Sequence, residues 1–407
     1  MNLSYLTLPV VMVTFIGVAA GGIPGLKMNR ATIAMVAAVL LVTLGIITPS
    51  AAFKAIDPYT LLLLFAMMVI GIHLRLAGFF DLLTRLVVRH IHSPGMLLAG
   101  VLMLAGLLSA LFLNDTVVIV FTPLVIDLTR LLRRNPLPYL IGLATSANIG
   151  SVATITGNPQ NILIGVSSRI PFVTFLGSLG PVAVCGLALT WVILTQLYRH
   201  EFTQPWMEDE LCLPPVEFDR PLLQKCIVLV VLMFAGFLAG APMPLFAILV
   251  AAMLMISRRI EPETIFTRID WTLLVFFSSL FVVTGALEQT DAIQRILAQL
   301  TTWADLTTGL ALATALLSNL VSNVPAVLLL QPIVLQSTHP AQGWLVLAMA
   351  STLAGNLTLL GSVANLIVAE AAQGQGVKIT FVEYLRAGIP ITFLTILIGI
   401  AWLGMSR

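Results

Sequence analysis

Two pairs of polar clusters interrupt the apolar stretches of this chain and are its best candidates for a chemical function. The first pair is Leu113 to Pro123 and Ser322 to Pro332, each with an Asn nine residues before a Pro. The second pair is residues 154–161 and 358–365, each with a central Gly. Unwound backbone and amide side chains survive in hydrocarbon only where protein or a polar cavity satisfies them. A duplicated pair of such breaks therefore predicts a transporter's binding site.

The chemistry of such a site follows from the helix ends that the breaks create. Helix N-termini offer unpaired N–H groups and partial positive charge, which suit an anion. Freed carbonyl groups, with Asn and Thr oxygens, suit a small cation such as sodium. We predict that the solute is bound by Asn114, Thr116, Asn158, Asn161, Ser322, Asn323, Ser362 and Asn365. We predict that ion coupling uses Asn114, Asp115, Ser146, Asn148, Thr154, Asn319, Asn323 and Thr358.

Structural roles compete with these assignments. Ser and Thr in membrane helices commonly bond back to their own backbone, and an Asn at a helix start can act as a cap. Asp115 differs because the second cluster has Val324 in its place, and an ionisable residue at membrane depth is a functional candidate by default. Asp57 and Asp270 also correspond between the halves, but each precedes an apolar stretch, where a capping role is expected.

The remaining reactive residues predict neither a metal centre nor an enzyme. His90 and His92 flank basic residues and have no third ligand nearby in the sequence. The three cysteines, Cys185, Cys212 and Cys226, lack zinc-like spacing. No embedded His/Glu cluster or nucleophile–base pair is evident. We therefore expect no cofactor beyond a sodium ion or proton as the coupling ion.

Composition identifies the surroundings of the chain. With 59% hydrophobic residues, 9% charged residues and a mean hydropathy of +1.04, it departs far from the soluble average of about 25% charged residues. It is predicted to lie in a lipid bilayer, and its net charge of +2 is too small to suggest nucleic acid. Residues 1–22 are apolar without a basic start, which favours a first membrane span over a signal peptide.

Apolar stretches of about 20 residues predict the membrane spans. They lie roughly at 3–22, 31–48, 59–78, 138–166 and 171–198, then at 223–240, 243–257, 270–290, 341–370 and 387–404. The spans 138–166 and 341–370 are broken, and segments 96–133 and 306–338 are predicted to be re-entrant hairpins. The fold class is thus an all-α polytopic membrane protein with two five-span repeats, 1–198 and 223–407, joined by a cytoplasmic linker at 199–222.

The basic residues predict how this chain is oriented. An odd number of spans in each repeat requires the second repeat to be inverted. If the N-terminus and C-terminus both lie outside, the cytoplasmic segments hold 15 of the 20 Lys and Arg residues, against 4 outside and 1 unassigned. This division agrees with the positive-inside rule for a protein of the inner (cytoplasmic) membrane. It also brings the tips of the two hairpins together near the membrane midplane.

Together these features resemble the ion transporter superfamily, which includes divalent anion sodium symporters, citrate transporters and arsenite permeases. The resemblance covers nearly the whole chain. It implies an elevator transporter, in which hairpins and broken helices form a mobile domain beside a scaffold that is usually dimeric. The dicarboxylate symporters carry Ser-Asn-Thr at each tip, whereas this chain has Leu113-Asn114-Asp115 and Ser322-Asn323-Val324. The Asn-Asp tip is more similar to the arsenite permeases, and the Gly157–Asn161 loop resembles poorly characterised anion permeases.

We therefore expect a homodimeric secondary transporter of a small anion, either a carboxylate or an inorganic oxyanion, coupled to sodium or protons. A sodium/proton antiporter that uses Asp115 and an arsenite exporter are the alternatives. An intramembrane enzyme is less favoured. A channel also fits less well, because paired inverted hairpins suit alternating access better than a continuous pore.

Overall fold

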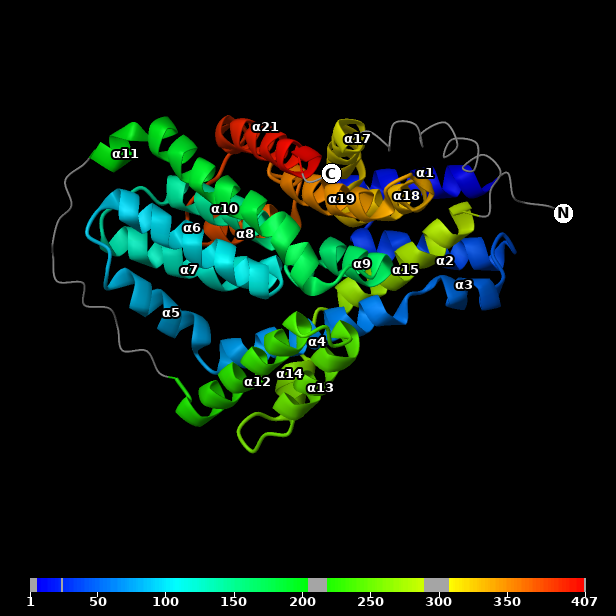
Figure 1. Cartoon of the computed structure of the whole chain (residues 1–407), viewed down its shortest axis with the longest axis horizontal. Coiled ribbons are helices and arrows are strands. Elements are labelled where there is room, and N and C mark those ends of the chain that lie inside the picture. Colours follow the sequence, from blue (N-terminus) through cyan, green and yellow to red (C-terminus); the bar gives the residue numbers. More distant parts are fainter. Residues whose placement is uncertain (1–5, 23–24, 204–217, 289–306, 406–407) are drawn as a thin grey trace.

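The computed structural model describes residues 6–22, 25–203, 218–288 and 307–405, and in these ranges the chain forms helices and no strand (Figure 1). The first half contains α1 (Thr7–Ala20), α2 (Arg30–Thr43), α3 (Pro49–Ala55), α4 (Pro58–Leu76), α5 (Phe79–Val88), α6 (Pro94–Leu111), α7 (Asn114–Leu131), α8 (Pro136–Ser151), α9 (Pro159–Ser168), α10 (Phe172–Leu197) and α11 (Arg199–Thr203). The second half contains α12 (Arg220–Leu238), α13 (Met243–Met255), α14 (Pro262–Phe266), α15 (Trp271–Glu288), α17 (Thr307–Val321), α18 (Asn323–Gln336), α19 (Pro340–Ala354), α20 (Val363–Gly374) and α21 (Phe381–Met405).

Many of these helices begin at a polar cap followed by proline. Thr48, Asp57, Ser93, Asn135 and Asn158 each accept a hydrogen bond from a backbone N–H of the first turn, and each precedes a Pro. The cap satisfies a donor that has no partner inside the helix, and Pro at the first position loses no intrahelical hydrogen bond. The starts of these helices are therefore encoded by neighbouring residues in the sequence.

The predicted breaks are present in the structure. Two residues separate the end of α6 from the start of α7, and these two helices pack against one another as a helical hairpin; α17 and α18 form the second such hairpin. Residues 152–158 separate α8 from α9, and residues 355–362 separate α19 from α20. All four interruptions predicted from the polar clusters are thus confirmed as breaks between helices.

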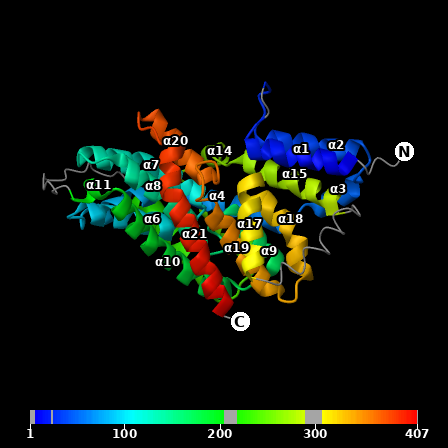
Figure 2. The same ribbon diagram turned by 90° about the horizontal axis from the view of Figure 1, so that it is seen from above.

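The helices form two groups. In the first group α6 and α7 pack on α8, α17 and α18 pack on α19, α20 packs on α7 and α8, and α10 packs along α21. In the second group α2 packs on α15 and α13 packs on α4, with α1 against α2 and α12 against α13. Figure 1 shows α12, α13 and α14 below the first group, and Figure 2 shows α1, α2, α3 and α15 together at one end. In the second group, helices of the two halves therefore pack on each other: α2 of the first half on α15 of the second, and α13 of the second half on α4 of the first.

One predicted boundary was wrong. The stretch 31–48 is not one helix, because α2 ends at Thr43, Gly45 adopts a left-handed φ of +69°, and the Thr48 cap starts the separate helix α3. Within the segment 199–222, whose role as a cytoplasmic linker stays a prediction, α11 occupies the first residues and α12 begins at Arg220. Asp219 caps α12 and pairs with Arg259 at 2.8 Å, and the Leu222 N–H and this guanidinium hold the pKa of Asp219 below its usual range. Residues 204–217 of the predicted linker lie outside the described residues.

Six of the described helices are long and apolar enough to cross a membrane: α4, α6, α10, α12, α15 and α21. Helices α1 and α2 have 14 residues each and α13 has 13, which gives lengths of only about 20 Å against a hydrocarbon core of about 30 Å. Helix α6 belongs to a predicted hairpin although its length alone would allow a span. The count of ten spans therefore stays a prediction.

Helices α6 and α8 approach most closely at a pair of glycines. A Cβ added to Gly150 would lie 2.0 Å from the carbonyl oxygen of Gly106, which is backbone and cannot rotate away. Small residues that let helix backbones meet are a main source of helix association in membranes. Gly150 therefore fixes the distance between the hairpin and the broken helix beside it.

We predict that Gly150→Ala lowers the stability of the purified protein by about 2 kcal/mol or more, because the methyl group forces two backbones apart. Gly177→Ala is the matched control, since a Cβ there has nothing within 4 Å and Ala is the better helix former. Thermal unfolding in detergent should show a lower midpoint for Gly150→Ala alone. Equal midpoints in the two variants would contradict the close contact.

Candidate functional site

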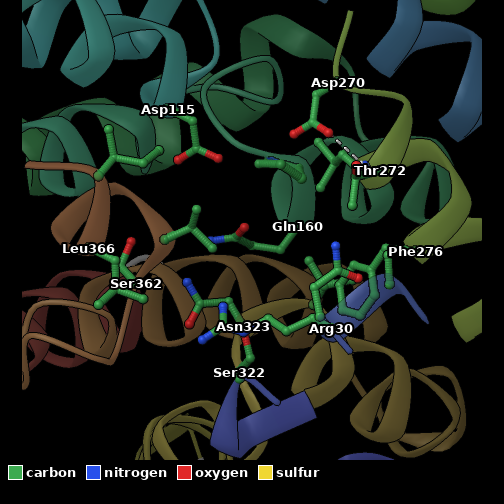
Figure 3. Close-up of a pocket in the computed structure, with 18 of the residues that line it drawn as sticks. Arg30, Asp115, Gln160, Asp270, Thr272, Phe276, Ser322, Asn323, Ser362 and Leu366 are labelled. Atoms are coloured by element: carbon green, nitrogen blue, oxygen red, sulfur yellow. Dashed lines mark hydrogen bonds between the residues drawn. The ribbon is translucent and has the colours of Figure 1, made fainter. Parts of the chain in front are cut away.

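One cavity of about 380 Å³ lies where four helices begin. Asn114 at the start of α7, Gln160 in the first turn of α9, Asn323 at the start of α18 and Val363 at the start of α20 all line it. Figure 3 shows Asp115, Gln160, Asn323 and Ser362 around this space. Each helix start presents N–H groups and the positive end of its dipole. The helix starts around the cavity can therefore donate hydrogen bonds to oxygen atoms of a bound molecule.

Asn148 is the centre of a buried amide network beneath this cavity. Its Oδ1 accepts hydrogen bonds from Asn114 Nδ2 at 3.1 Å and Ser362 Oγ at 3.0 Å. Its Nδ2 donates to Asn356 Oδ1 at 2.8 Å and to Asn365 Oδ1 at 3.1 Å. All four hydrogen-bonding positions of the amide are filled, and three of the partners belong to the other half of the chain. The network therefore joins the first hairpin to the second broken helix.

Each break is closed by an Asn in an identical way. Asn161 Nδ2 donates to the carbonyl oxygens of Ser151 and Thr154, both at 3.0 Å. Asn365 Nδ2 donates to the carbonyl oxygens ten and seven residues before it, those of Gly355 at 2.8 Å and Thr358 at 3.1 Å. These side chains satisfy carbonyls that the interrupted helix leaves unpaired.

Polar side chains also link the first break to α19. Asn158 Nδ2 donates to Ser151 Oγ at 2.9 Å and to Thr352 Oγ1 at 3.2 Å. Gln160 Nε2 donates to Thr352 Oγ1 at 3.2 Å, and Thr352 Oγ1 donates to Asn161 Oδ1 at 3.4 Å. Because these residues are buried and mutually bonded, they fix the position of the α9 start, where Pro159 and Gln160 line the cavity.

The hairpin tips are tied to the breaks through backbone oxygens. The Asn114 N–H donates to Gly157 O at 2.9 Å, and Thr154 Oγ1 donates to Ala110 O. In the second half Asn319 Nδ2 donates to Ala354 O at 3.0 Å. The Oδ1 of Asn319 is buried and has no hydrogen-bond partner among the described residues. A buried amide oxygen without a donor is an acceptor that is open to a cation or water.

The predicted site residues fall into two sets. Asn114, Asp115, Ser322, Asn323 and Ser362 line the cavity. The others lie behind it or apart from it: Thr116 faces Gly71 of α4, Ser146 bonds to Leu143 O within α8, and Asn148, Thr154, Asn158, Asn161, Asn319, Thr358 and Asn365 belong to the supporting network described above. Their roles in binding and coupling stay predictions.

Sequence reasoning missed a third group of lining residues. Arg30 was interpreted only as a cytoplasmic charge, Asp270 only as a cap, and Gln160 and Glu370 were not considered, yet all four line the cavity. Asp270 does cap α15, with its Oδ1 accepting from Leu273 N at 3.0 Å. No local signal places Arg30 and Asp270 here, because α2 and α15 are brought to the cavity by helix packing, including their packing on each other.

The charges of the lining are unequal. Among the described residues that line the cavity, Arg30 carries positive charge and Asp115, Asp270 and Glu370 carry carboxylates. Arg30 and Asp115 attract one another electrostatically without an ion pair between them being formed. Across the described part of the chain, no cluster of three His, Cys, Asp or Glu residues is arranged to hold a metal ion. The site is thus built from amides, helix starts and a few opposed charges.

Comparison with known proteins agrees with this architecture. Residues 11–354 match the family model described as citrate transporter. The chain is 32% identical to the silicon efflux transporter LSI3 of Oryza sativa subsp. japonica, over 94% of each chain. It is 25% identical to the putative transporter arsB of Dictyostelium discoideum, covering 92% of this chain and 87% of the relative. The solved structure of the Alcanivorax borkumensis YdaH transporter is similar in fold, with a TM-score of 0.58 at 16% identity over 98% of this chain and 96% of that one.

The fold and the site define a helical membrane transporter. The chain belongs to the citrate transporter family, because the family model covers most of its length. The resemblance to the ion transporter superfamily that the hairpin tips and the Gly157–Asn161 loop suggested is confirmed.

We predict that Asn148→Ala destabilises the protein by about 2–4 kcal/mol, because it leaves several buried polar groups unpaired at once. Asn135→Ala is the matched control, since Asn135 is an exposed helix cap whose loss costs about 1 kcal/mol. Thermal unfolding in detergent compares the two variants. A shift for Asn148→Ala no larger than that of the control would argue against a central role for this amide.

Proposed function

We propose that this protein is a secondary active transporter that binds a small anion, a carboxylate or an inorganic oxyanion, in the cavity between its helix starts. One observation carries this proposal: the N-termini of α7, α9, α18 and α20 and the guanidinium of Arg30 surround a single space. Helix N-termini and guanidinium groups are the commonest protein donors to carboxylate and oxyanion groups.

Coupling to a cation fits the rest of the lining. The anion must enter a cavity that also contains Asp115, so a sodium ion or proton bound there would remove the repulsion. Carboxylate and amide oxygens suit sodium, and the unpartnered Oδ1 of Asn319 is a further candidate ligand. We propose Asp115 as the main coupling residue and Asn319, on α17 of the second hairpin, as a further one.

We further propose an elevator mechanism in two inverted repeats, residues 1–198 and 223–407. Support comes from the matched helix order and the reciprocal packing of α2 on α15 and of α13 on α4. The first group of helices, with the hairpins and broken helices, would move against the second group. Both termini would lie outside the inner membrane, as the division of basic residues favours, and the protein would be a homodimer.

A second candidate substrate is an uncharged hydroxylated solute, such as silicic or arsenous acid. Three carboxylates in the lining would repel an anion but accept hydrogen bonds from hydroxyl groups. The names of the rice silicon efflux transporter and of the putative transporter arsB support this candidate. The two candidates differ in the charge of the solute and share the same cavity.

Proteoliposomes containing the purified protein can decide between them. We expect uptake or exchange of at least one solute from a panel of citrate, succinate, sulfate, phosphate, arsenite and silicic acid, with a rate that depends on an imposed sodium or proton gradient. Transport of citrate or an oxyanion supports the first candidate. Transport of only the uncharged members supports the second, and no gradient-dependent movement of any member would refute the proposed function.

We predict that Asp115→Asn impairs ion coupling more than solute binding. The amide keeps the size of the side chain but removes the charge that would hold sodium or carry a proton. The measurement is the sodium and pH dependence of transport, with the KM for the solute taken alongside. Asp81→Asn, which removes a carboxylate on α5 away from the cavity, is the control. Unchanged sodium and pH dependence in Asp115→Asn would leave this residue a structural role.

A further inference from the structure

We propose that Arg30, on the second group of helices, binds the negatively charged group of the transported solute. This inference rests on the proposed transport function and assigns recognition of the negative charge of the solute to one residue. Hairpin tips and broken helices supply the other donors, whereas Arg30 begins α2, which packs on α15. The solute would thus be held between the two groups of helices.

The backbone at Arg30 is fixed by local hydrogen bonds. Asn29 caps α2, and its Oδ1 accepts from Thr32 N and Thr32 Oγ1, each at 2.9 Å. A Cβ built on Gly21, which also lines the cavity, would lie 4.0 Å from Arg30 Nε. The side chain therefore passes the end of α1 to reach the cavity, and Figure 3 shows it there with Asn323 and Asp115. Its position follows from a capped helix start rather than from a mobile loop.

The guanidinium of Arg30 has unused donors. In the described part of the chain this group makes no hydrogen bond and no ion pair, although the residue is half-buried. A guanidinium has five N–H donors, and withdrawing it from water without partners is unfavourable. A carboxylate or oxyanion of the solute would accept two of these hydrogen bonds in parallel. A negatively charged solute would therefore supply the hydrogen-bond acceptors that the Arg30 guanidinium lacks in the described part of the chain.

A purely electrostatic role is the competing explanation. Arg30 attracts Asp115 and could serve only to offset the carboxylates of the lining. The two roles differ in one measurable respect. If Arg30 binds the solute, replacing it should raise the KM for a charged solute far more than the KM for an uncharged one. If it only balances the charge of the lining, replacing it should change both KM values, because the shape of the site changes.

The first test compares Arg30→Gln, Arg30→Lys and the control Lys27→Gln in proteoliposomes, with citrate as the charged probe and arsenite, mostly uncharged arsenous acid at neutral pH, as the other. Lys27 is exposed, lies outside the cavity lining, and its change removes the same charge. We expect the KM for citrate to rise about 10- to 100-fold in Arg30→Gln, the usual range for a lost charged hydrogen bond. Arg30→Lys should recover part of this loss, and Lys27→Gln should match the wild type.

An unchanged KM for citrate in Arg30→Gln would overturn the proposal. The proposal would also be overturned if the wild type transported arsenite but not citrate and Arg30→Gln had the same KM for arsenite. That outcome would still support the transport function. A rise in KM for citrate with little change for arsenite supports the assignment.

A second test needs no transport. The thermal unfolding midpoint in detergent is measured for the wild type, Arg30→Gln and Lys27→Gln, each with and without citrate. We expect citrate to raise the midpoint of the wild type and of Lys27→Gln and to raise that of Arg30→Gln much less, because a ligand stabilises a protein according to its affinity. An equal rise in Arg30→Gln, or no rise in any of the three, would overturn the proposal. A rise with citrate in a protein that moves no member of the panel would refute transport and retain anion binding.

Discussion

Every interrupted helix inside this protein leaves backbone carbonyl and N–H groups that hydrocarbon cannot satisfy, and the centre of the molecule is organised around that constraint. Asn161 and Asn365 each bond to two carbonyls of the break that precedes them. The hairpin tips contribute in turn, since the Asn114 N–H bonds to Gly157 O. The starts of α7, α9, α18 and α20 line the cavity.

The supporting network has a consequence for stability and for communication between the halves. Asn148 joins Asn114 of the first hairpin to Asn356 and Asn365 of the second broken helix. A fully satisfied buried network is stabilising, whereas the same network with one missing member leaves several polar groups unpaired. Asn148 thus connects the first hairpin tip to the other half of the chain through a single side chain. This arrangement suits a site in which binding at one helix start must affect the next.

Family membership and substrate are separate questions for this protein. The chain belongs to the citrate transporter family, yet one of its relatives is named for silicon efflux and another for arsB. The lining reflects this breadth, because helix starts and Arg30 favour negative charge while Asp115, Asp270 and Glu370 oppose it. Fold alone does not identify the solute, since similar scaffolds carry different sites. Under the proposed function, selectivity would depend on the balance of these few charges.

The sequence by itself determined the membrane class, the four breaks and several helix starts, because each is encoded by neighbouring residues: apolar length, Gly and Asn clusters, and a cap before Pro. It also identified Asn114, Asp115 and Asn323, which line the cavity. Only the tertiary structure decided that Asn148 supports the site while Arg30 and Asp270 line it. Residues some 200 positions apart meet there through helix packing, and packing partners leave no local pattern in the chain. The wrong end assigned to α2 has a different, local reason: a left-handed Gly and a helix cap compete with apolar length, and the local geometry prevailed.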